Sequence, residues 1–388
     1  MERCWIVTDS GSSFSASDFH IPGRELGWGD DASCRKTTLH GGRQTGVEII
    51  ELCNGPLSLR ICPTRGMGIV DGRFGRYPLG WRSPVSEIVH PQFINLLEMG
   101  GRGAHYGFNE LLNRCGIEWS GAMGEDEVRN NMGAVERIFL PLHGKVGWTP
   151  ASRVRLLAAE GRVTVEGDIP EEMVFGVAYR LRTRLTLEEG RASIAVEDTL
   201  TNLGESPGEY EMLYHTNFGA PFLEAGSRYF GSYDRVIPRD RFAAAGLDTL
   251  TTMPGPTAGF VEQVFLFRAR ADREGFAHQL LANREEDLAV QVSFTVDTLP
   301  YTILWKRCAG LREGYVVGLN PCSDLPNPRR AERAAGRVKT LAAGAEVSFH
   351  HHIDLFEGSE AVGRAIETVR DVRGPEQVGE AGDFGFLS

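Results

Sequence analysis

The stretch that most clearly indicates the fold is Tyr179-Arg180-Leu181-Arg182-Thr183-Arg184-Leu185-Thr186-Leu187. Its apolar side chains recur at every second position, and arginines occupy three of the positions between them. Because successive side chains of a strand point to opposite faces, this pattern predicts a half-buried antiparallel strand. A second alternating run, Ile194 to Leu200, follows the turn Glu188-Glu189-Gly190-Arg191. The two runs together predict a β-hairpin.

Further strands are predicted along most of the chain, at residues 47–53, 57–61, 162–169, 261–267, 288–296, 301–305, 314–319 and 346–356. The 47 glycines and 19 prolines favour many turns and therefore many short strands. Helices are predicted only at 108–115 and at 359–372, where Ser359 is a candidate N-cap. Strands at this density without intervening helices indicate a mainly all-β protein of stacked antiparallel sheets with few short helices. We expect an N-terminal extension at residues 1–45 and a single domain at 46–388.

Composition excludes several classes of partner. The chain has 388 residues, 41% of them hydrophobic, and a formal net charge of −11. An acidic surface repels phosphates, so we expect no nucleic acid and no membrane as partners. No apolar run approaches the length of a membrane span, and the N-terminus lacks the apolar region of a signal peptide. The seven cysteines include no Cys-x-x-Cys pair, which argues against structural zinc and fits reduced thiols in the cytoplasm.

Two motifs that suggest other chemistry are incomplete. The glycines of Gly66-Met67-Gly68 and Gly101-Arg102-Gly103 do not complete a dinucleotide-binding loop before a helix. His350-His351-His352 resembles a metal cluster, but neighbouring side chains of a strand point to opposite faces. At most His350 and His352 can share a ligand, so a structural role in a late strand is favoured and no metal is expected.

Polar side chains combine with tight turns in several segments, and these are the candidate site. The segments are 63–68, 112–116, 141–144 and 214–221, with a further one at 318–324. His215 lies in Tyr214-His215-Thr216-Asn217-Phe218-Gly219 and His143 in Leu142-His143-Gly144. Histidine is the side chain best suited to move protons near neutral pH. Its combination with a hydroxyl, an amide and aromatic rings is typical of a site for a sugar-sized polar ligand.

Taken together, these segments resemble the galactose-mutarotase-like superfamily, the aldose 1-epimerases, and more closely a bacterial branch long described only as a domain of unknown function. The resemblance covers roughly residues 47 to 356. It rests on the order and spacing of Arg65-Gly66-Met67-Gly68, Gly80-Trp81-Arg82-Ser83-Pro84, Val89-His90-Pro91, Arg114-Cys115-Gly116, Leu142-His143-Gly144 and His215-Thr216-Asn217-Phe218-Gly219. It implies a β-supersandwich of two large antiparallel sheets, with a carbohydrate bound in a cleft on the concave face.

The resemblance also implies roles for individual residues. His215 matches the general acid, which protonates the ring oxygen of a pyranose, and His143 matches the histidine that supports it. Arg114 and Arg65 are expected to bind substrate hydroxyls, as are the amides of Asn217 and Asn320. Mutarotation moves one proton to the ring oxygen and one from the anomeric hydroxyl, so groups that titrate near pH 7 serve it well. No cofactor is required.

The match breaks where aldose 1-epimerases carry their catalytic glutamate. Asn320 stands at that position, and an amide cannot take up a proton at neutral pH. Asp324 can supply the carboxylate instead, as can Glu313, although its distance along the strand disfavours it. The third possibility is that no classical base exists.

The leading hypothesis is therefore a cytoplasmic aldose 1-epimerase, a mutarotase acting on a free sugar or sugar derivative. The alternatives are a non-catalytic carbohydrate-binding or sensing protein on the same fold, or another sugar isomerase or lyase. For a lyase, Tyr214 and Tyr210 are the nearby tyrosines.

Overall fold

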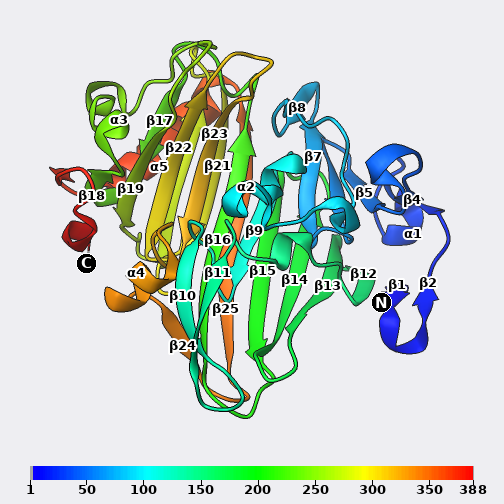
Figure 1. Cartoon of the computed structure of the whole chain (residues 1–388). Coiled ribbons are helices and arrows are strands. Elements are labelled where there is room, and N and C mark those ends of the chain that lie inside the picture. Colours follow the sequence, from blue (N-terminus) through cyan, green and yellow to red (C-terminus); the bar gives the residue numbers. More distant parts are fainter. Residues whose placement is uncertain (1–2, 388) are drawn as a thin grey trace.

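Two large β-sheets packed face to face form the body of the molecule in a computed structural model, which describes residues 3–387 (Figure 1). Neighbouring strands run antiparallel throughout both sheets, except for one parallel pair at an edge. The prediction of a mainly all-β protein with two stacked antiparallel sheets is confirmed.

One sheet has ten strands. In spatial order these are β17 (Arg228–Gly231), β20 (Phe276–Ala282), β21 (Leu288–Thr295), β25 (Glu346–Glu357), β15 (Ser193–Asn202), β14 (Ala178–Glu188), β13 (Arg162–Glu172), β12 (Arg153–Ala159), β1 (Arg3–Asp9) and β2 (Phe14–Ser15). The predicted hairpin is confirmed as β14 and β15, in which Leu185 lies opposite Val196.

The other sheet carries the candidate site, and we call it the site sheet. Its order is β26 (Gln377–Val378), β18 (Tyr233–Pro238), β19 (Gln263–Ala269), β22 (Tyr301–Cys308), β23 (Tyr315–Cys322), β16 (Gly208–Phe218), β9 (Leu112–Ile117), β7 (Gly68–Phe74), β6 (Leu57–Cys62), β5 (Glu48–Asn54), β4 (Ala32–Thr38) and β3 (Phe19–Pro22). In addition, β24 (Lys339–Leu341) pairs with β16, and β8 (Tyr77–Leu79) pairs with β7. A separate hairpin consists of β10 (Gly124–Arg129) and β11 (Val135–Leu140).

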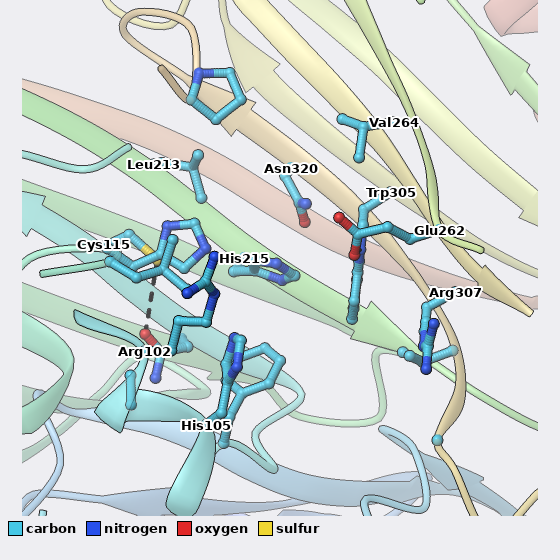
Figure 2. A pocket seen from close by; sticks show the side chains of 18 of the residues that line it. Arg102, His105, Cys115, Leu213, His215, Glu262, Val264, Trp305, Arg307 and Asn320 are labelled. Carbon is cyan, nitrogen blue, oxygen red and sulfur yellow. Dashed lines mark hydrogen bonds between the residues drawn. The ribbon is translucent and has the colours of Figure 1, made fainter. Parts of the chain in front are cut away.

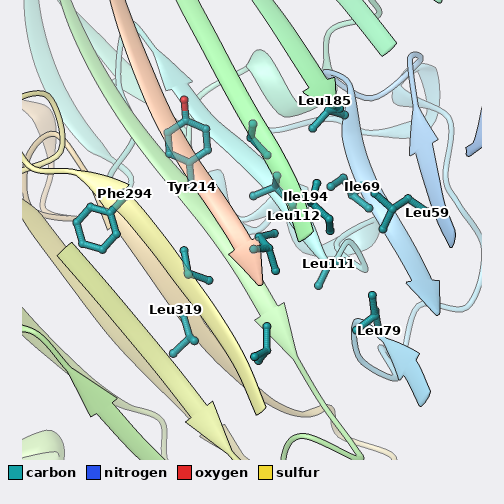
Figure 3. Close-up of a cluster of buried hydrophobic side chains, with 14 of the residues drawn as sticks. Leu59, Ile69, Leu79, Leu111, Leu112, Leu185, Ile194, Tyr214, Phe294 and Leu319 are labelled. Carbon is teal, nitrogen blue, oxygen red and sulfur yellow. The ribbon is translucent and has the colours of Figure 1, made fainter. Parts of the chain in front are cut away.

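The main hydrophobic core fills the space between the sheets (Figure 3). Leu185 and Ile194 come from the ten-stranded sheet, and Leu59, Leu112 and Leu319 come from the site sheet; all are buried. Apolar side chains at alternate positions of each strand meet across this space, which is why the period-two pattern identified the architecture.

The N-terminal segment contributes to both sheets. Its strands β1 and β2 extend the ten-stranded sheet, whereas β3 and β4 extend the site sheet (Figure 1). The sequence predicted an extension at residues 1–45 ahead of a domain at 46–388. Residues 3–38 supply strands to both sheets, and the division into an extension and a domain stays a prediction.

Helices are few and mostly short. The predicted helix at 359–372 is confirmed as α5 (Ser359–Val372), although Gly358 rather than Ser359 is its N-cap residue. Buried Val362, Ala365, Ile366 and Val369 pack with Phe230, Leu280 and Ala289 of the ten-stranded sheet. The remaining α-helices are α1 (Gly23–Leu26), α2 (Glu98–Gly101), α3 (Arg241–Ala244) and α4 (Arg329–Ala334).

The prediction of a helix at 108–115 is wrong, because residues 112–117 form the central strand β9. Every residue of β9 is buried, and a strand covered on both faces loses the alternation that identifies strands in a sequence. Short 3₁₀ turns occupy η1 (Ser10–Ser12), η2 (Gly42–Gln44), η3 (Pro91–Phe93), η4 (Gly103–Tyr106), η5 (Val146–Trp148), η6 (Leu247–Thr249) and η7 (Phe384–Leu387). Within residues 3–387, no helix has the length and hydropathy needed to cross a membrane.

Candidate active site

A cavity of about 660 Å³ lies on the face of the site sheet that points away from the core (Figure 2). Its floor consists of side chains at alternate positions of five neighbouring strands or the residues next to them: Asn113 and Cys115, Leu213 and His215, Glu262 and Val264, Ile303, Trp305 and Arg307, and Val316 and Asn320. Its walls are loops that carry Trp81, Arg102, His105, Phe108, His143 and Trp148. Because successive side chains of a strand point to opposite faces, alternate residues of each strand face the cavity.

His215 lies on β16, within the strand rather than in a turn after it. Its Nδ1 is 2.7 Å from Oδ1 of Asn217, and the Asn217 amide donates to the carbonyl oxygen atoms of Glu110 and His215. The Asn217 oxygen therefore accepts a hydrogen bond from Nδ1–H. The rings of Phe108 and Trp305 each lie 5.1 Å from the imidazole, edge to face. Burial lowers the pKa of His215 to about 3, with a further contribution from His143.

His143 lies in the loop after β11. Its Nδ1 is 2.8 Å from the carbonyl oxygen of Ser120, so Nδ1 carries the proton. The residue has a positive φ of 65°, a conformation that costs a non-glycine residue energy and that surrounding contacts must hold. Its backbone amide donates to Gly121 O, and its carbonyl accepts from Gly116. Burial lowers the pKa of His143 to about 4.

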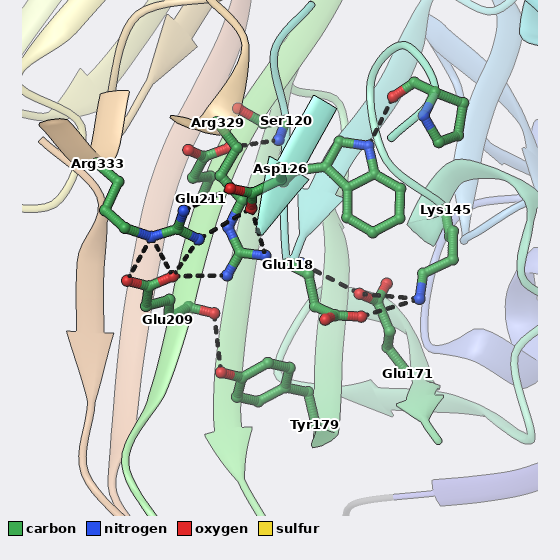
Figure 4. A network of polar contacts seen from close by, with 12 residues as sticks. Glu118, Ser120, Asp126, Lys145, Glu171, Tyr179, Glu209, Glu211, Arg329 and Arg333 are labelled. Carbon is green, nitrogen blue, oxygen red and sulfur yellow. Dashed lines mark hydrogen bonds and ion pairs between the residues drawn. The ribbon is translucent and has the colours of Figure 1, made fainter. Parts of the chain in front are cut away.

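The segment at 118–120, which holds His143, is fixed by a polar network (Figure 4). The Ser120 amide donates to Glu211 at 2.8 Å, and the Trp119 indole donates to the Pro141 carbonyl at 2.6 Å. Lys145 forms an ion pair with Glu118 at 2.9 Å. The loop with the strained histidine is thereby tied on both sides to the rigid body of the protein.

The two histidines lie side by side in the lining of the cavity. Their ring centroids are 5.6 Å apart. Both rings use Nδ1–H in hydrogen bonds to the protein, so in the neutral form both keep the Nε2 lone pair as an acceptor. The lowered pKa values make the neutral form dominant at pH 7. The arrangement thus presents two weakly basic nitrogen atoms to a ligand.

Glu262 is the carboxylate that sequence reasoning missed. It lines the cavity and accepts hydrogen bonds from the Trp305 indole and from Arg239, both at 2.9 Å. Burial acts to raise the pKa of Glu262, but these two hydrogen bonds act to lower it and have the larger combined effect. The pKa is below its usual value, so the carboxyl group is ionised. Its negative charge acts to raise the pKa values of His143 and His105. The alternation Glu262-x-Val264 at the start of β19 was the available signal.

Two arginines of the cavity supply positive charge. Arg102 comes from the glycine-rich loop before η4, which also carries His105, and Arg307 comes from β22. Figure 2 shows Arg102 on one side of His215 and Arg307 on the other. Glu313, an alternative base in the sequence reasoning, also lines the cavity, where its carboxylate accepts backbone hydrogen bonds from Gly259 and Gly310.

Asn320 lines the cavity at the position where a glutamate was expected. Its Oδ1 accepts a hydrogen bond from the Thr216 backbone amide at 3.0 Å. The ladder between β16 and β23 is interrupted at this point, with register pairs only at Leu213 and from Asn217 onward. The Asn320 side chain thus supplies the hydrogen-bond acceptor for the Thr216 amide that the backbone of β23 does not supply.

Asp324 does not line the cavity. It is 1% exposed and accepts hydrogen bonds from the hydroxyls of Ser120 and Ser323. Burial and the adjacent Glu211 raise the pKa of Asp324 well above its usual value. Asp324 reaches the site through Ser120, the residue that binds His143.

Arg65 and Arg114 also lie outside the cavity lining. Arg114 follows Asn113 on β9 and points to the opposite face, where it pairs with Asp198 of β15 at 2.6 Å and binds Thr183 and Met67. Arg65 pairs with buried Glu110 and stacks on Trp148, whose ring lies 4.5 Å away. Arg114 therefore connects the two sheets, and Arg65 supports one wall of the cavity.

The tyrosines near the histidine lie elsewhere too. Tyr214 is fully buried between the sheets, and its hydroxyl donates to Asp198 at 2.9 Å. Tyr210 is likewise not among the cavity residues. Within residues 3–387, no three His, Cys, Asp or Glu side chains are grouped so that they can hold a metal ion. His143 and His215 line the cavity together with the ionised carboxylate of Glu262, and imidazole and carboxylate groups are able to transfer protons.

Comparisons with known proteins agree with the fold. A family model described as "Domain of unknown function (DUF4432)" matches residues 44–355. The crystal structure of a proposed aldose 1-epimerase from Klebsiella pneumoniae subsp. pneumoniae MGH 78578 is 31% identical over 98% of both chains, with a TM-score of 0.91. No curated protein sequence matches the chain significantly.

More distant structures share the fold. A galactose mutarotase-like protein from Clostridium acetobutylicum is 13% identical, with a TM-score of 0.60, over 85% of this chain and all of its own. Galactose 1-epimerase from Lactobacillus acidophilus NCFM is 11% identical, with a TM-score of 0.51, over 84% of this chain and 99% of its own.

The class of protein is thus a galactose mutarotase-like β-sandwich with a histidine-lined cavity on one sheet. Within that class, the chain belongs to the DUF4432 family. The resemblance seen in the sequence is confirmed.

Proposed function

We propose that the protein is a cytoplasmic aldose 1-epimerase acting on a free sugar or sugar derivative. The observation that carries the proposal is that His143 and His215 line one cavity with their ring centroids 5.6 Å apart, while Nδ1 of each ring is hydrogen-bonded to the protein. The cavity volume of about 660 Å³ is in the usual range for small-molecule sites, and the rings of Trp81, Phe108 and Trp305 line it. The free state of all seven cysteines supports a reducing compartment.

The chemistry needs one group to accept a proton and one to donate it. As the bond between C1 and the ring oxygen breaks, a base takes the proton of the anomeric hydroxyl and an acid protonates the ring oxygen. Rotation about the C1–C2 bond and reversal of these steps give the other anomer, with no net change in protons. Two imidazoles, one neutral and one protonated, can fill both roles.

The sequence predicted His215 as the acid. Burial and His105 act to lower the pKa values of both histidines, but Glu262 acts to raise that of His143, whereas His143 acts to lower that of His215. These charges favour the opposite division of roles. We therefore assign the extra proton to His143 and the acceptor role to His215. Glu262 stabilises the imidazolium of His143, and Asn217 fixes the tautomer of His215. Asn320 is placed to hydrogen-bond a sugar hydroxyl.

The test is anomer exchange followed by NMR across a panel of aldoses and their derivatives. Wild-type protein accelerates exchange for at least one sugar, and His215→Ala and His143→Ala each lower the rate by roughly 100-fold or more. His20→Ala, at an exposed position of β3, is the matched control and retains the rate. Absence of acceleration for every sugar, with the fold intact, would contradict the proposal.

A second candidate function is binding of a sugar without turnover. Asn320 favours this function, because it stands where a catalytic carboxylate was expected. Its Oδ1 already accepts a hydrogen bond from the Thr216 backbone amide. Saturable binding of a sugar by calorimetry, without exchange and unchanged in His215→Gln, would support this function over catalysis.

A further inference from the structure

Three arginines line the cavity, and only one of them is neutralised. Arg239 forms ion pairs with Asp240 at 3.0 Å and with Glu262 at 2.9 Å. Across residues 3–387, Arg102 and Arg307 form no ion pair with a carboxylate, and their hydrogen bonds go to the carbonyl oxygen atoms of Met99 and Phe260. A guanidinium group stays charged at any relevant pH, so the cavity carries unneutralised positive charge.

The two unpaired arginines have different surroundings. Arg307 lies near enough to Glu262 for its charge to lower the pKa of that carboxyl group. The titratable neighbour of Arg102 is His105, whose pKa it lowers. Figure 2 places Arg102 across His215 from Glu262 and Arg307. The positive charge is therefore least compensated on the side of Arg102.

This local charge contrasts with the protein as a whole, which has a formal net charge of −11. An acidic surface repels anions in bulk solution, whereas a cleft with charge of one sign concentrates ligands of the opposite sign. The cavity therefore attracts anionic ligands, which the acidic surface of the protein repels.

We infer that the sugar bound in this cavity carries an anionic group, a carboxylate or a phosphate, and that Arg102 binds this group. The inference rests on the proposed function and specifies its substrate class. The planar guanidinium fork matches both kinds of anion and forms charge-assisted hydrogen bonds with them. Arg102 is exposed, and within residues 3–387 its guanidinium makes one hydrogen bond, at 3.3 Å, to the Met99 carbonyl oxygen, so its other N–H groups can contact a ligand.

An anionic substrate also meets a need of the proposed chemistry. His105, adjacent to Arg102, and His143 are both neutral without a ligand, because burial lowers their pKa values. A negative charge bound beside them favours their protonated forms. The bound anion would in this way help His143 to carry the proton that the ring oxygen receives.

Isothermal titration calorimetry with matched sugars tests the inference. The probes are glucose, glucuronate and glucose 6-phosphate, together with the same three forms of galactose. The uronates and the phosphates distinguish a carboxylate from a phosphate as the preferred anion. The ratio of anionic to neutral affinity is measured for wild-type protein, for Arg102→Gln and for the control Arg24→Gln, which alters an exposed arginine of α1 that does not line the cavity.

We expect wild-type protein to prefer one anionic form by roughly ten- to hundredfold, the contribution of charge-assisted hydrogen bonds. Arg102→Gln removes this preference, and Arg24→Gln retains it. Equal affinity for neutral and anionic sugars, binding of none of them, or a preference unchanged in Arg102→Gln would overturn the inference. Anomer exchange of neutral sugars without an anionic preference would leave the proposed function standing and reject only the substrate class. Binding of anionic sugars without anomer exchange would support the substrate class and reject the proposed function.

Discussion

The imidazole rings of His143 and His215 lie edge to face with their centroids 5.6 Å apart and their planes inclined by 73°. One ring comes from a loop and the other from the central strand β16, and each has its Nδ1 proton bound by a protein oxygen. The pair thereby offers two Nε2 atoms to the same ligand. Its chemistry depends on the groups that set the protonation of each ring, and these groups are open to experiment.

Replacement of Asn217 tests the group that fixes His215. In Asn217→Asp, a carboxylate replaces the amide oxygen that lies 2.7 Å from Nδ1, and a neighbouring negative charge stabilises the imidazolium. We expect the pKa of His215 to rise from about 3 by on the order of 2 units, measured by NMR titration of the ring. Asn217→Ser is the control without charge. Equal His215 pKa values in the two variants would show that Asn217 does not act through this contact.

The charge of Glu262 is tested in Glu262→Gln. Because the carboxylate acts to raise the pKa values of His143 and His105, its neutralisation lowers both further, and anomer exchange slows by roughly tenfold. Glu313→Gln is the matched control, since Glu313 lines the same cavity but is held by backbone amides of Gly259 and Gly310. A larger loss in the Glu313 variant would assign the carboxylate role to Glu313.

The pair of Arg114 and Asp198 is predicted to stabilise the fold. Both side chains are fully buried and connect the two sheets, so Arg114→Ala leaves a carboxylate buried without its partner. We expect a loss of about 3–5 kcal/mol in the free energy of unfolding, measured by urea denaturation. Arg162→Ala, at a largely exposed pair with Glu188, is expected to cost about 0–1 kcal/mol. Comparable losses in both variants would contradict the role of Arg114.

His351 links stability to pH. Its ring is buried 4.4 Å from that of Tyr214, neither ring nitrogen has a hydrogen-bond partner within residues 3–387, and burial lowers its pKa to about 3. Below pH 6.5 the His351 side chain binds a proton in the unfolded chain but not in the folded protein. The free energy of unfolding therefore falls as the pH drops toward 3. His351→Phe removes this linkage and leaves no nitrogen unpaired.

We expect the free energy of unfolding of His351→Phe at pH 7 to exceed that of wild-type protein by about 1–3 kcal/mol. The gain is larger by on the order of 2 kcal/mol near pH 4.5. Urea denaturation at both pH values measures the difference, and His20→Phe on the exposed surface is the control. A stability difference that does not change with pH would show that His351 keeps the same charge in both states.

The sequence alone determined the architecture. The alternation from Tyr179 to Leu187 predicted a half-buried strand, and its repetition predicted stacked sheets, because side-chain direction along a strand is a local property. The same local reasoning identified α5 from its helical spacing. It failed for β9, where burial on both faces removes the pattern and propensity alone suggested a helix.

The sequence also located His143 and His215, whose residue type and motif context are visible without a structure. Only the tertiary structure decided which polar residues share their cavity. Arg114 and Tyr214 belong to the quoted motifs but point to the core, since neighbours on a strand face opposite ways. Glu262 belongs to no quoted motif, and Arg102 was quoted only as part of an incomplete glycine-rich motif. Both reach the cavity because the strand order brings β19 near β16 and a loop covers it. A chain encodes the direction of each side chain locally, but only the pairing of distant strands determines which side chains meet.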